Sequence, residues 1–213
     1  MKYIIPAIIA ISILSCQAKK PDTNDRSIEN ASTQKLDTAT LAGGCFWCTE
    51  ASFEQIEGVQ DVVSGYSGGK EETARYKVIG TGKTGHAECV QVYFDPEVIS
   101  YEVLLKIFFT AHDPTQLNRQ GPDVGTQYRS AIFYHNEAQL ETAKKVIAEI
   151  QPDYDKDIVT EINPLESFFK AEYYHQDFEK NHPNYPYIQQ VSRPKIERVK
   201  MKFEDLLKEE END

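Results

Sequence analysis

Two cysteines, Cys45 and Cys48, flank a Phe-Trp pair in the stretch LAGGCFWCTEASFEQI, residues 41–56. A Cys-x-x-Cys pair can act as a redox couple, form half of a zinc site or simply bring two thiols close together. A zinc site needs two further ligands at suitable spacing, and the five histidines of the chain are scattered, with no second cysteine pair near them. We therefore expect no metal and favour redox chemistry.

The residues around this pair predict a helix that begins at Cys45. Gly43 and Gly44 allow a tight turn into it, and apolar residues recur at helical spacing from Phe46 until Gly58. A cysteine at a helix N-terminus lies beside unpaired amides and the positive end of the helix dipole, and both favour its ionised form. The sequence thus predicts a thiolate at Cys45.

A carboxyl group is predicted on the buried face of a strand over HAECVQVYFDP, residues 86–96. Val90, Val92 and Phe94 alternate onto one face, and Glu88 has the same parity. Burial without a cationic partner raises the pKa of a carboxyl and can keep it protonated near neutral pH. A protonated acid beside a thiolate is what reduction of an oxygen-bearing substrate requires. The alternative is that the strand begins one residue later and Glu88 is solvated.

The remaining pattern predicts strands and helices without steady βα alternation, which indicates an α+β sandwich. Further strands are expected over residues 61–69, 130–135 and 157–162, and helices after Ser100 and Asn136, which can act as N-caps. The last segment, residues 194–210, carries a narrow apolar stripe on a charged helix, so we expect it to dock loosely or fray.

The N-terminal residues predict export. Lys2 precedes an apolar run from Tyr3 to Leu14 that is too short to span a bilayer, and the run ends in ILSC. This ending resembles the bacterial lipobox, in which the cysteine receives lipid and becomes the mature N-terminus; an ordinary signal peptide with an incidental Cys16 is the alternative. We expect a signal peptide over residues 1–15, lipidation of Cys16, and a membrane-anchored lipoprotein that faces the periplasm or the cell exterior.

The rest of the chain is expected to form one domain. Residues 16–40 are polar and predict a flexible tether, residues 41–190 a single domain, and residues 191–213 a charged helical extension. With 34 acidic and 23 basic residues the net charge is −11, which argues against binding of nucleic acid or of anionic lipid through the protein surface. Three cysteines after Cys16 do not make a disulfide scaffold. We expect a monomer.

Five ordered segments resemble the type A family of peptide methionine-S-sulfoxide reductases: GGCFWCTEASFEQIEGV, VVSGYSGG, GHAECVQVYFDP, FFTAHDPTQLNRQGPDVGTQYRSAIFY and TEINPLESFFKAEYYHQDF. They span roughly residues 41–187. The resemblance implies a two-layer sandwich with a mixed sheet and a ferredoxin-like core. It also implies reduction of the S epimer of methionine sulfoxide, in proteins, in peptides and as the free amino acid. No bound cofactor is implied, and thioredoxin or another thiol would be the external reductant.

The same resemblance implies roles for individual residues. Cys45 matches the nucleophile that attacks the sulfoxide sulfur and ends as a sulfenic acid. Phe46 and Trp47 match the aromatic wall that holds the substrate methyl group, and Glu88 matches the acid that donates to the sulfoxide oxygen. The other matches are Tyr76 and Tyr128, which hold that oxygen, Asp123, which lines the site, and His86, which flanks the acid.

The resemblance does not identify the thiol that resolves the sulfenic acid. Many type A enzymes carry a resolving cysteine near the C-terminus, but no cysteine follows Cys89 here. Cys48 lies one turn along the same helix, a separation that a disulfide at a helix start can close, whereas Cys89 alternates onto the opposite sheet face from Glu88 and is expected to be a small buried hydrophobe. We favour Cys48, with direct reduction by an external thiol as the alternative.

Two other classes of protein use some of these features. A thioredoxin-like disulfide oxidoreductase also carries Cys-x-x-Cys, but typically with small or polar residues between the cysteines, and the bulky Phe-Trp pair better suits a substrate wall. A lipid-anchored binding module would need no nucleophile. Reduction of a methionine sulfoxide peptide separates these classes.

Overall fold

The computed structural model describes residue 1 and residues 35–209 of the 213-residue chain. The chain divides into two units, Met1–Thr33 and Gln34–Asp213, and every element below belongs to the second. The expected signal peptide and Cys16, and the part of the tether before residue 35, lie outside the described residues. None of the helices between residues 35 and 209 has the length and apolar content that crossing a membrane requires.

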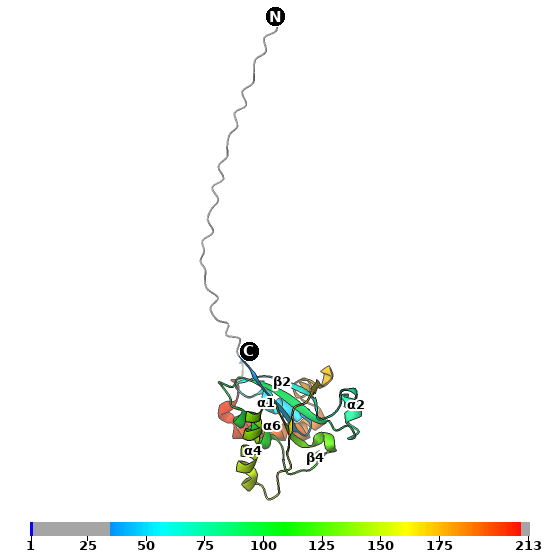
Figure 1. Cartoon of the computed structure of the whole chain (residues 1–213), viewed down its shortest axis with the longest axis vertical. Coiled ribbons are helices and arrows are strands. Elements are labelled where there is room, and N and C mark those ends of the chain that lie inside the picture. The colour runs from blue at the N-terminus through cyan, green and yellow to red at the C-terminus, as the bar shows by residue number, and fades with distance from the viewer. Residues whose placement is uncertain (2–34, 210–213) are drawn as a thin grey trace. The chain divides into compact units, whose positions relative to one another are not determined.

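Six strands form one mixed sheet in the order β7-β6-β1-β3-β2-β8. Figure 1 shows the domain and labels β2 of this sheet. Neighbouring strands are antiparallel except β6 and β7, which are parallel. The strands are β1 (Asp37–Gly43), β2 (Val59–Ser67), β3 (Ala87–Phe94), β6 (Ser130–Tyr134), β7 (Glu161–Pro164) and β8 (Phe168–Lys170). Two short strands, β4 (Arg119–Gln120) and β5 (Asp123–Val124), pair separately.

Several strand boundaries differ from the sequence prediction, among them those of β2, which spans 59–67 where 61–69 was expected. β1 begins at Asp37, inside the segment 16–40 that we expected to be a tether, because its residues pair with β3 and Ala39 is fully buried. The strand expected over residues 157–162 begins only at Glu161. The strand over residues 86–96 is confirmed as β3.

The helices begin at the expected caps. The Ser100 hydroxyl accepts a hydrogen bond from the Val103 amide (3.3 Å), and the Asn136 side chain accepts one from the Gln139 amide (3.0 Å). The helices are α1 (Phe46–Glu54), α2 (Tyr76–Ile79), α3 (Tyr101–Ala111), α4 (Glu137–Ile150), α5 (Phe178–Asn181) and α6 (Arg193–Lys202). Single 3-10 turns lie at Glu71–Thr73, Thr126–Tyr128, Gln151–Asp153, Tyr173–His175 and Glu204–Leu206, and a π-helical turn spans Ile188–Ser192.

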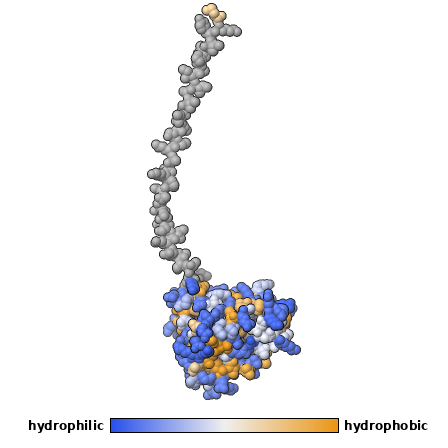
Figure 2. All heavy atoms as spheres, viewed as in Figure 1, coloured by the Kyte–Doolittle hydropathy of each residue, from blue (hydrophilic) through white to orange (hydrophobic). Residues whose placement is uncertain are grey.

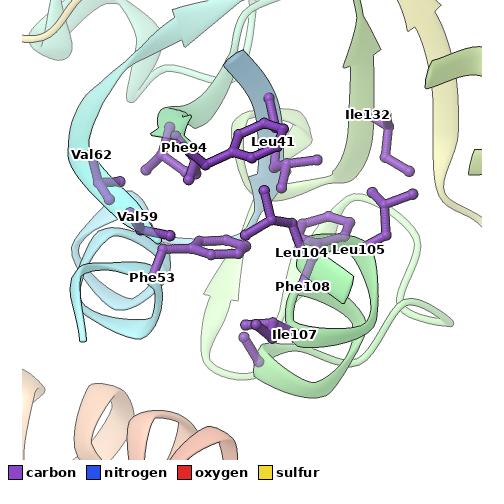
Figure 3. Close-up of a cluster of buried hydrophobic side chains, with 14 of the residues drawn as sticks. Leu41, Phe53, Val59, Val62, Phe94, Leu104, Leu105, Ile107, Phe108 and Ile132 are labelled. Carbon is purple, nitrogen blue, oxygen red and sulfur yellow. The ribbon is translucent and has the colours of Figure 1, made fainter. Parts of the chain in front are cut away.

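The main core lies between the sheet and helices α1, α3 and α4 (Figure 3). Leu41, Phe94 and Ile132 project from the strands toward Phe53 of α1 and Phe108 of α3, and all are almost fully buried. A smaller cluster on the opposite sheet face consists of Ala42, Ala87, Cys89, Ala131 and Phe133. Hydrophilic residues cover much of the visible face of the domain (Figure 2). The α+β sandwich is therefore confirmed, and so is Cys89 as a small buried hydrophobe.

The C-terminal helix is an integral part of the domain, which corrects the expectation of a loosely docked extension over residues 191–213. Helix α6 packs on α1 and α3, and its apolar stripe is buried, with Val199 fully enclosed and Ile196 only 7% exposed. The chain continues along the core to Leu207, which forms a β-bridge with Ile56. That bridge replaces the last turn expected for the helix after Cys45, which ends at Glu54.

Truncation of Val199 tests whether α6 stabilises the domain. Val199→Ala removes two fully buried methyl groups and leaves a cavity, so the free energy of unfolding should fall by about 2 kcal/mol. Met201→Ala on the same helix is the matched control, because Met201 is 75% exposed. The measurement is urea denaturation followed by circular dichroism. Equal stability of the two variants would show that α6 contributes no core packing.

Candidate active site

A tight turn at the end of β1 places Cys45 at the start of α1. Gly44 in this turn has a φ of +97°, and a Cβ atom there would approach the Gln120 side chain to 2.7 Å, so glycine is required. Cys45 is the N-cap of α1, and its carbonyl oxygen accepts a hydrogen bond from the Cys48 amide at 3.2 Å. The predicted position of Cys45 is confirmed, and its side chain is nearly buried, with 6% exposed.

Glu88 of β3 lies beneath this helix start. Its carboxyl group is 2% exposed, and Oε2 accepts a hydrogen bond from the Phe46 amide at 3.2 Å. Burial raises the pKa of the Glu88 carboxyl to about 8, against the lowering effect of that hydrogen bond. The expected burial of Glu88 is thus confirmed, its raised pKa favours the protonated form at neutral pH, and the carboxyl adjoins the residue next to Cys45.

Aromatic rings surround the first turn of α1. Phe46 is 1% exposed and stacks with the Tyr76 ring at a centroid distance of 6.4 Å. The Trp47 indole stacks on Phe178 at 3.8 Å, and its N–H donates to Nδ1 of His175 at 3.2 Å. Burial lowers the pKa of His175, which keeps the ring neutral and able to accept this bond. The arrangement fixes Trp47 as one wall of the site.

Tyrosine hydroxyls converge on the same place. Burial and then the nearby Glu88 raise the pKa of Tyr76 to about 12. The pKa of Tyr128 is also raised by burial and by Glu88. The Tyr187 hydroxyl donates a hydrogen bond to the Asp123 carboxylate. The Tyr76 and Tyr128 hydroxyls stay protonated at neutral pH, so they can donate hydrogen bonds to a substrate oxygen.

The charge on the cysteine pair differs from the sequence prediction. Burial raises the pKa of the Cys45 thiol well above its ordinary value, and the hydrogen bond to Cys48 adds to this. The pKa of Cys48 is lowered to about 6, first by that hydrogen bond and then by the nearby Lys195 ammonium. Burial thus outweighs the helix start at Cys45 and favours the neutral thiol there, whereas the surroundings of Cys48 favour its ionised form.

Two residues that the sequence analysis considered for the site, His86 and Cys89, lie apart from this centre. His86 is fully buried, its Nε2 pairs with the Lys70 carbonyl at 3.0 Å, and its ring packs edge-on against Phe169. It therefore stands behind the acid as a packing group. Cys89 belongs to the cluster on the opposite sheet face. The other candidates, Cys45, Cys48, Phe46, Trp47, Tyr76, Glu88, Asp123 and Tyr128, are brought together.

Sequence reasoning missed several residues that complete the site. Glu172 accepts hydrogen bonds from the Tyr66 hydroxyl (2.9 Å) and from the Tyr76 amide (3.0 Å), so it holds two aromatic residues of the site. Tyr187, Ser192 and Lys195 reach the cysteines from the chain that precedes α6 and from α6 itself. Tyr187, Ser192 and Lys195 lie beyond the five segments that resemble the family. Glu172 lies inside the last of these segments, but it carries no periodic signal.

Together the fold and this centre define a class of protein, an α+β oxidoreductase whose chemistry depends on thiols beside a neutral carboxylic acid. Residues 37–207 match the family model described as peptide methionine sulfoxide reductase. The chain belongs to the peptide methionine sulfoxide reductase family.

Individual relatives agree with this membership. The peptide methionine sulfoxide reductase MsrA of Natronomonas pharaonis is 53% identical over 168 residues, which are 78% of this chain and 94% of the relative. The Pasteurella multocida MsrA is 53% identical over 170 residues, covering 80% of this chain and 98% of the relative. Among solved structures, reduced Mxr1 from Saccharomyces cerevisiae has a TM-score of 0.68 at 39% identity, covering 71% of this chain and 88% of that chain. Methionine sulfoxide reductase A of Corynebacterium diphtheriae has a TM-score of 0.67 at 34% identity, with coverages of 70% and 76%.

A group of acidic residues, Glu50 and Glu54 of α1 and the nearby Asp177, lies away from the thiols. Glu50 of α1 is 1% exposed, and burial together with the nearby Glu54 raises the pKa of its carboxyl to about 8. Burial and Asp177 raise the pKa of Glu54 to about 7. Both carboxyls ionise near pH 4.5 when the chain is unfolded. The folded protein therefore binds more protons between these values, so its free energy of unfolding falls as pH rises from about 4.5 to about 8.

Replacement of Glu50 should reduce this pH dependence. One such carboxyl contributes a slope of up to about 1.4 kcal/mol per pH unit, and Glu50→Gln abolishes its share because the amide does not titrate. The unfolding free energy should therefore change less between pH 5 and pH 8 than in the parent, as measured by urea denaturation at several pH values. The exposed Glu57→Gln is the control. An unchanged slope in Glu50→Gln would mean that Glu50 is ionised in the folded protein.

Proposed function

We propose that this chain reduces the S epimer of methionine sulfoxide, in proteins, in peptides and as the free amino acid, with Cys45 as nucleophile and Glu88 as acid. The observation that carries this proposal is the Glu88 carboxyl, which is buried, protonated at neutral pH and bonded to the amide that follows Cys45. Reduction of a sulfoxide needs both a sulfur nucleophile and a proton for the oxygen that departs. Membership in the family supports the same reaction.

The reaction can be followed atom by atom. The Cys45 sulfur forms a bond to the sulfoxide sulfur, and the sulfoxide oxygen takes the proton of Glu88. As its sulfur bonds to the substrate the Cys45 thiol becomes acidic, and its proton passes to the Cys48 thiolate, which already shares a hydrogen bond with it. The hydroxyl then moves to Cys45, the sulfur–sulfur bond breaks, and methionine leaves. The substrate sulfur gains two electrons, and Cys45 loses two as it becomes a sulfenic acid.

The aromatic residues would select and orient the substrate. Phe46 and Trp47 offer an apolar wall for the methyl group, while Tyr76 and Tyr128 donate hydrogen bonds to the oxygen. Because methyl and oxygen must face different walls, only one sulfoxide epimer presents its sulfur to Cys45. A surface groove lined by Pro122, Asp123, Tyr185, Pro186, Tyr187, Gln190 and Val191 offers a place for the flanking peptide.

Cys48 is the thiol we assign to resolve the sulfenic acid. It shares a hydrogen bond with Cys45 and lies in the first turn of the same helix. Its sulfur attacks the Cys45 sulfur, the S–O bond breaks, and the hydroxyl leaves as water with the proton held by Cys48. The resulting disulfide is a substrate for a thioredoxin-type dithiol, which works by thiol–disulfide exchange. Cys89 is separated from this pair by the sheet.

The anchoring of the protein is a separate part of the proposal. The apolar run from Tyr3 to Leu14 and the ILSC ending support cleavage before Cys16, lipidation of that cysteine, and a monomer held on a membrane outside the cytoplasm. Mass spectrometry of the natively expressed protein tests this. The expected result is a chain that starts at a diacylated Cys16, and an unmodified Cys16 or an uncleaved chain would contradict it.

Activity is tested directly with a methionine sulfoxide peptide of defined epimer and dithiothreitol as reductant. We expect methionine from the S epimer only. Cys45→Ser should abolish the reaction, because a hydroxyl is a far poorer nucleophile and cannot form a sulfenic acid. Cys89→Ala should retain it, since Cys89 lies outside the site. Reduction of neither epimer by folded parent protein would rule out the proposed function.

Replacement of Glu88 tests the acid. Glu88→Gln should slow reduction by about 10²-fold or more, the usual scale for loss of a general acid. The parent rate should fall as pH rises through about 8, where Glu88 loses its proton, and the residual rate of the variant should lack that step. The exposed Glu97→Gln is the matched control. If Glu88→Gln kept the parental rate and pH profile, another group would have to supply the proton.

Replacement of Cys48 tests the resolving step. Cys48→Ser should still form one equivalent of methionine and leave a Cys45 sulfenic acid that dimedone traps. The diagnostic quantity is the amount of methionine formed in this single turnover and not its rate, because loss of the proton acceptor Cys48 also slows the step. Turnover with thioredoxin should collapse, whereas turnover with dithiothreitol should persist. A Cys45–Cys89 disulfide in the parent, or full thioredoxin turnover in Cys48→Ser, would contradict the assignment.

A further inference from the structure

A lysine and a serine from the C-terminal part of the chain meet the Cys48 sulfur. The Ser192 hydroxyl lies 3.0 Å from Sγ of Cys48 and is fully buried. The Lys195 ammonium lies 3.8 Å from the same sulfur, and its residue is only 7% exposed. Helix α6 begins at Arg193, so both groups are held at its first turn.

Lys195 needs a negative partner at this depth. A buried ammonium group is costly unless it is paired, because it loses the solvation that water provides. Among the ion pairs that the structure describes in residues 35–209, none includes Lys195. Its Nζ instead contacts Sγ of Cys48. A thiolate at Cys48 supplies the charge that Lys195 lacks.

The Asp123 carboxylate, which also lies near the cysteine pair, accepts a hydrogen bond from the Tyr187 hydroxyl, and Asp113 beside His112 is bonded to Thr115 and Gln116. The remaining titratable groups around Cys48 do not supply the missing charge. Tyr187 and Cys45 keep their protons, because burial raises the pKa of each, and Glu88 is protonated at neutral pH. On the side of α3, burial lowers the pKa of His112 to about 4, so that ring is neutral and pairs with the Phe108 carbonyl and the Ser130 hydroxyl. Arg198, the next cation of α6, is exposed.

We propose that Ser192 and Lys195 form a thiolate-holding site for Cys48, and that Lys195 is a positioning residue for the resolving step. The proposal rests on the proposed function in one respect, the role of Cys48 as the resolving thiol. Lys195 and Ser192 keep the negative charge of the cysteine pair on Cys48 rather than on Cys45. The lowered pKa of Cys48, about 6, agrees with this placement.

The site would act at two moments of the cycle. Once substrate is bound, the Cys48 thiolate is the base that accepts the Cys45 proton as Cys45 attacks. After the sulfenic acid forms, Lys195 favours loss of that proton from Cys48, and the proton joins the departing hydroxyl as water while the S–S bond forms. Helix α6 is thereby a part of the redox machinery and not only of the core.

Titration of the Cys48 thiolate tests the proposal without substrate. Thiolate absorbance at 240 nm is followed against pH, and the increment that disappears in Cys48→Ser is assigned to Cys48. We expect a half-point near pH 6 in the parent and a rise of about 1–3 pH units in Lys195→Met, the usual effect of removing an adjacent charge. Lys195→Arg should stay near the parent, and Ser192→Ala should rise by less than Lys195→Met. The control is Lys200→Met on the same helix, whose half-point should not move.

A second readout links the titration to the reaction. After one equivalent of sulfoxide, the pH dependence of Cys45–Cys48 disulfide formation should shift upward in Lys195→Met by the same amount as the titration. A parent half-point near the ordinary cysteine value of about 8.5, or a Lys195→Met half-point equal to that of Lys200→Met, would overturn the proposal. If Lys195→Met does not fold, the parent half-point and Ser192→Ala still decide it. Failure of the proposed function is recognised separately, because the parent would then form no methionine.

Discussion

The hydrogen bond from the Phe46 amide to the buried Glu88 carboxyl joins the sheet to the first turn of α1, and the rest of the site depends on it. The bond draws the helix start, and with it Cys45, onto the face of β3 where apolar residues exclude water. Exclusion of water makes Glu88 an acid with a proton to give at neutral pH. The same exclusion keeps the proton on Cys45 until a substrate arrives. One contact thus sets the position and the protonation of both reacting groups.

This arrangement explains why the flanking aromatic residues come from distant parts of the chain. The first turn of α1 supplies Phe46 and Trp47, but their orientation depends on Tyr76, His175 and Phe178, each on a different short element. Loops positioned by a rigid sheet and helix can carry such residues without disturbing the core. The core itself needs only the sheet and the helices that cover one of its faces (Figure 3).

The sequence contained enough to predict the α+β class, most strands and the two capped helices, since these follow from local periodicity and from cap residues. Periodicity left the burial of Glu88 open, and the resemblance to the family decided it. The helix start favoured a thiolate at Cys45, but a helix start is a local feature, whereas burial of Cys45 and the contact of Cys48 with Lys195 are set by tertiary packing and favour ionisation of Cys48 instead. The stripe on α6 was visible, but nothing local showed that α1 and α3 leave a place for it. Tyr187 and Lys195 were missed because they lie beyond the segments that resemble the family and reach the site only through tertiary packing.

The burial of Lys195 also has a thermodynamic consequence for the oxidised protein. When Cys48 enters a disulfide, its sulfur loses its charge, and the ammonium group 3.8 Å away loses its partner while it stays buried. The reduced state is then stabilised relative to the oxidised state, which raises the reduction potential of the Cys45–Cys48 couple. A couple of this kind accepts electrons readily from an external dithiol, so regeneration of the thiols is favoured by the packing of a helix that never touches the substrate.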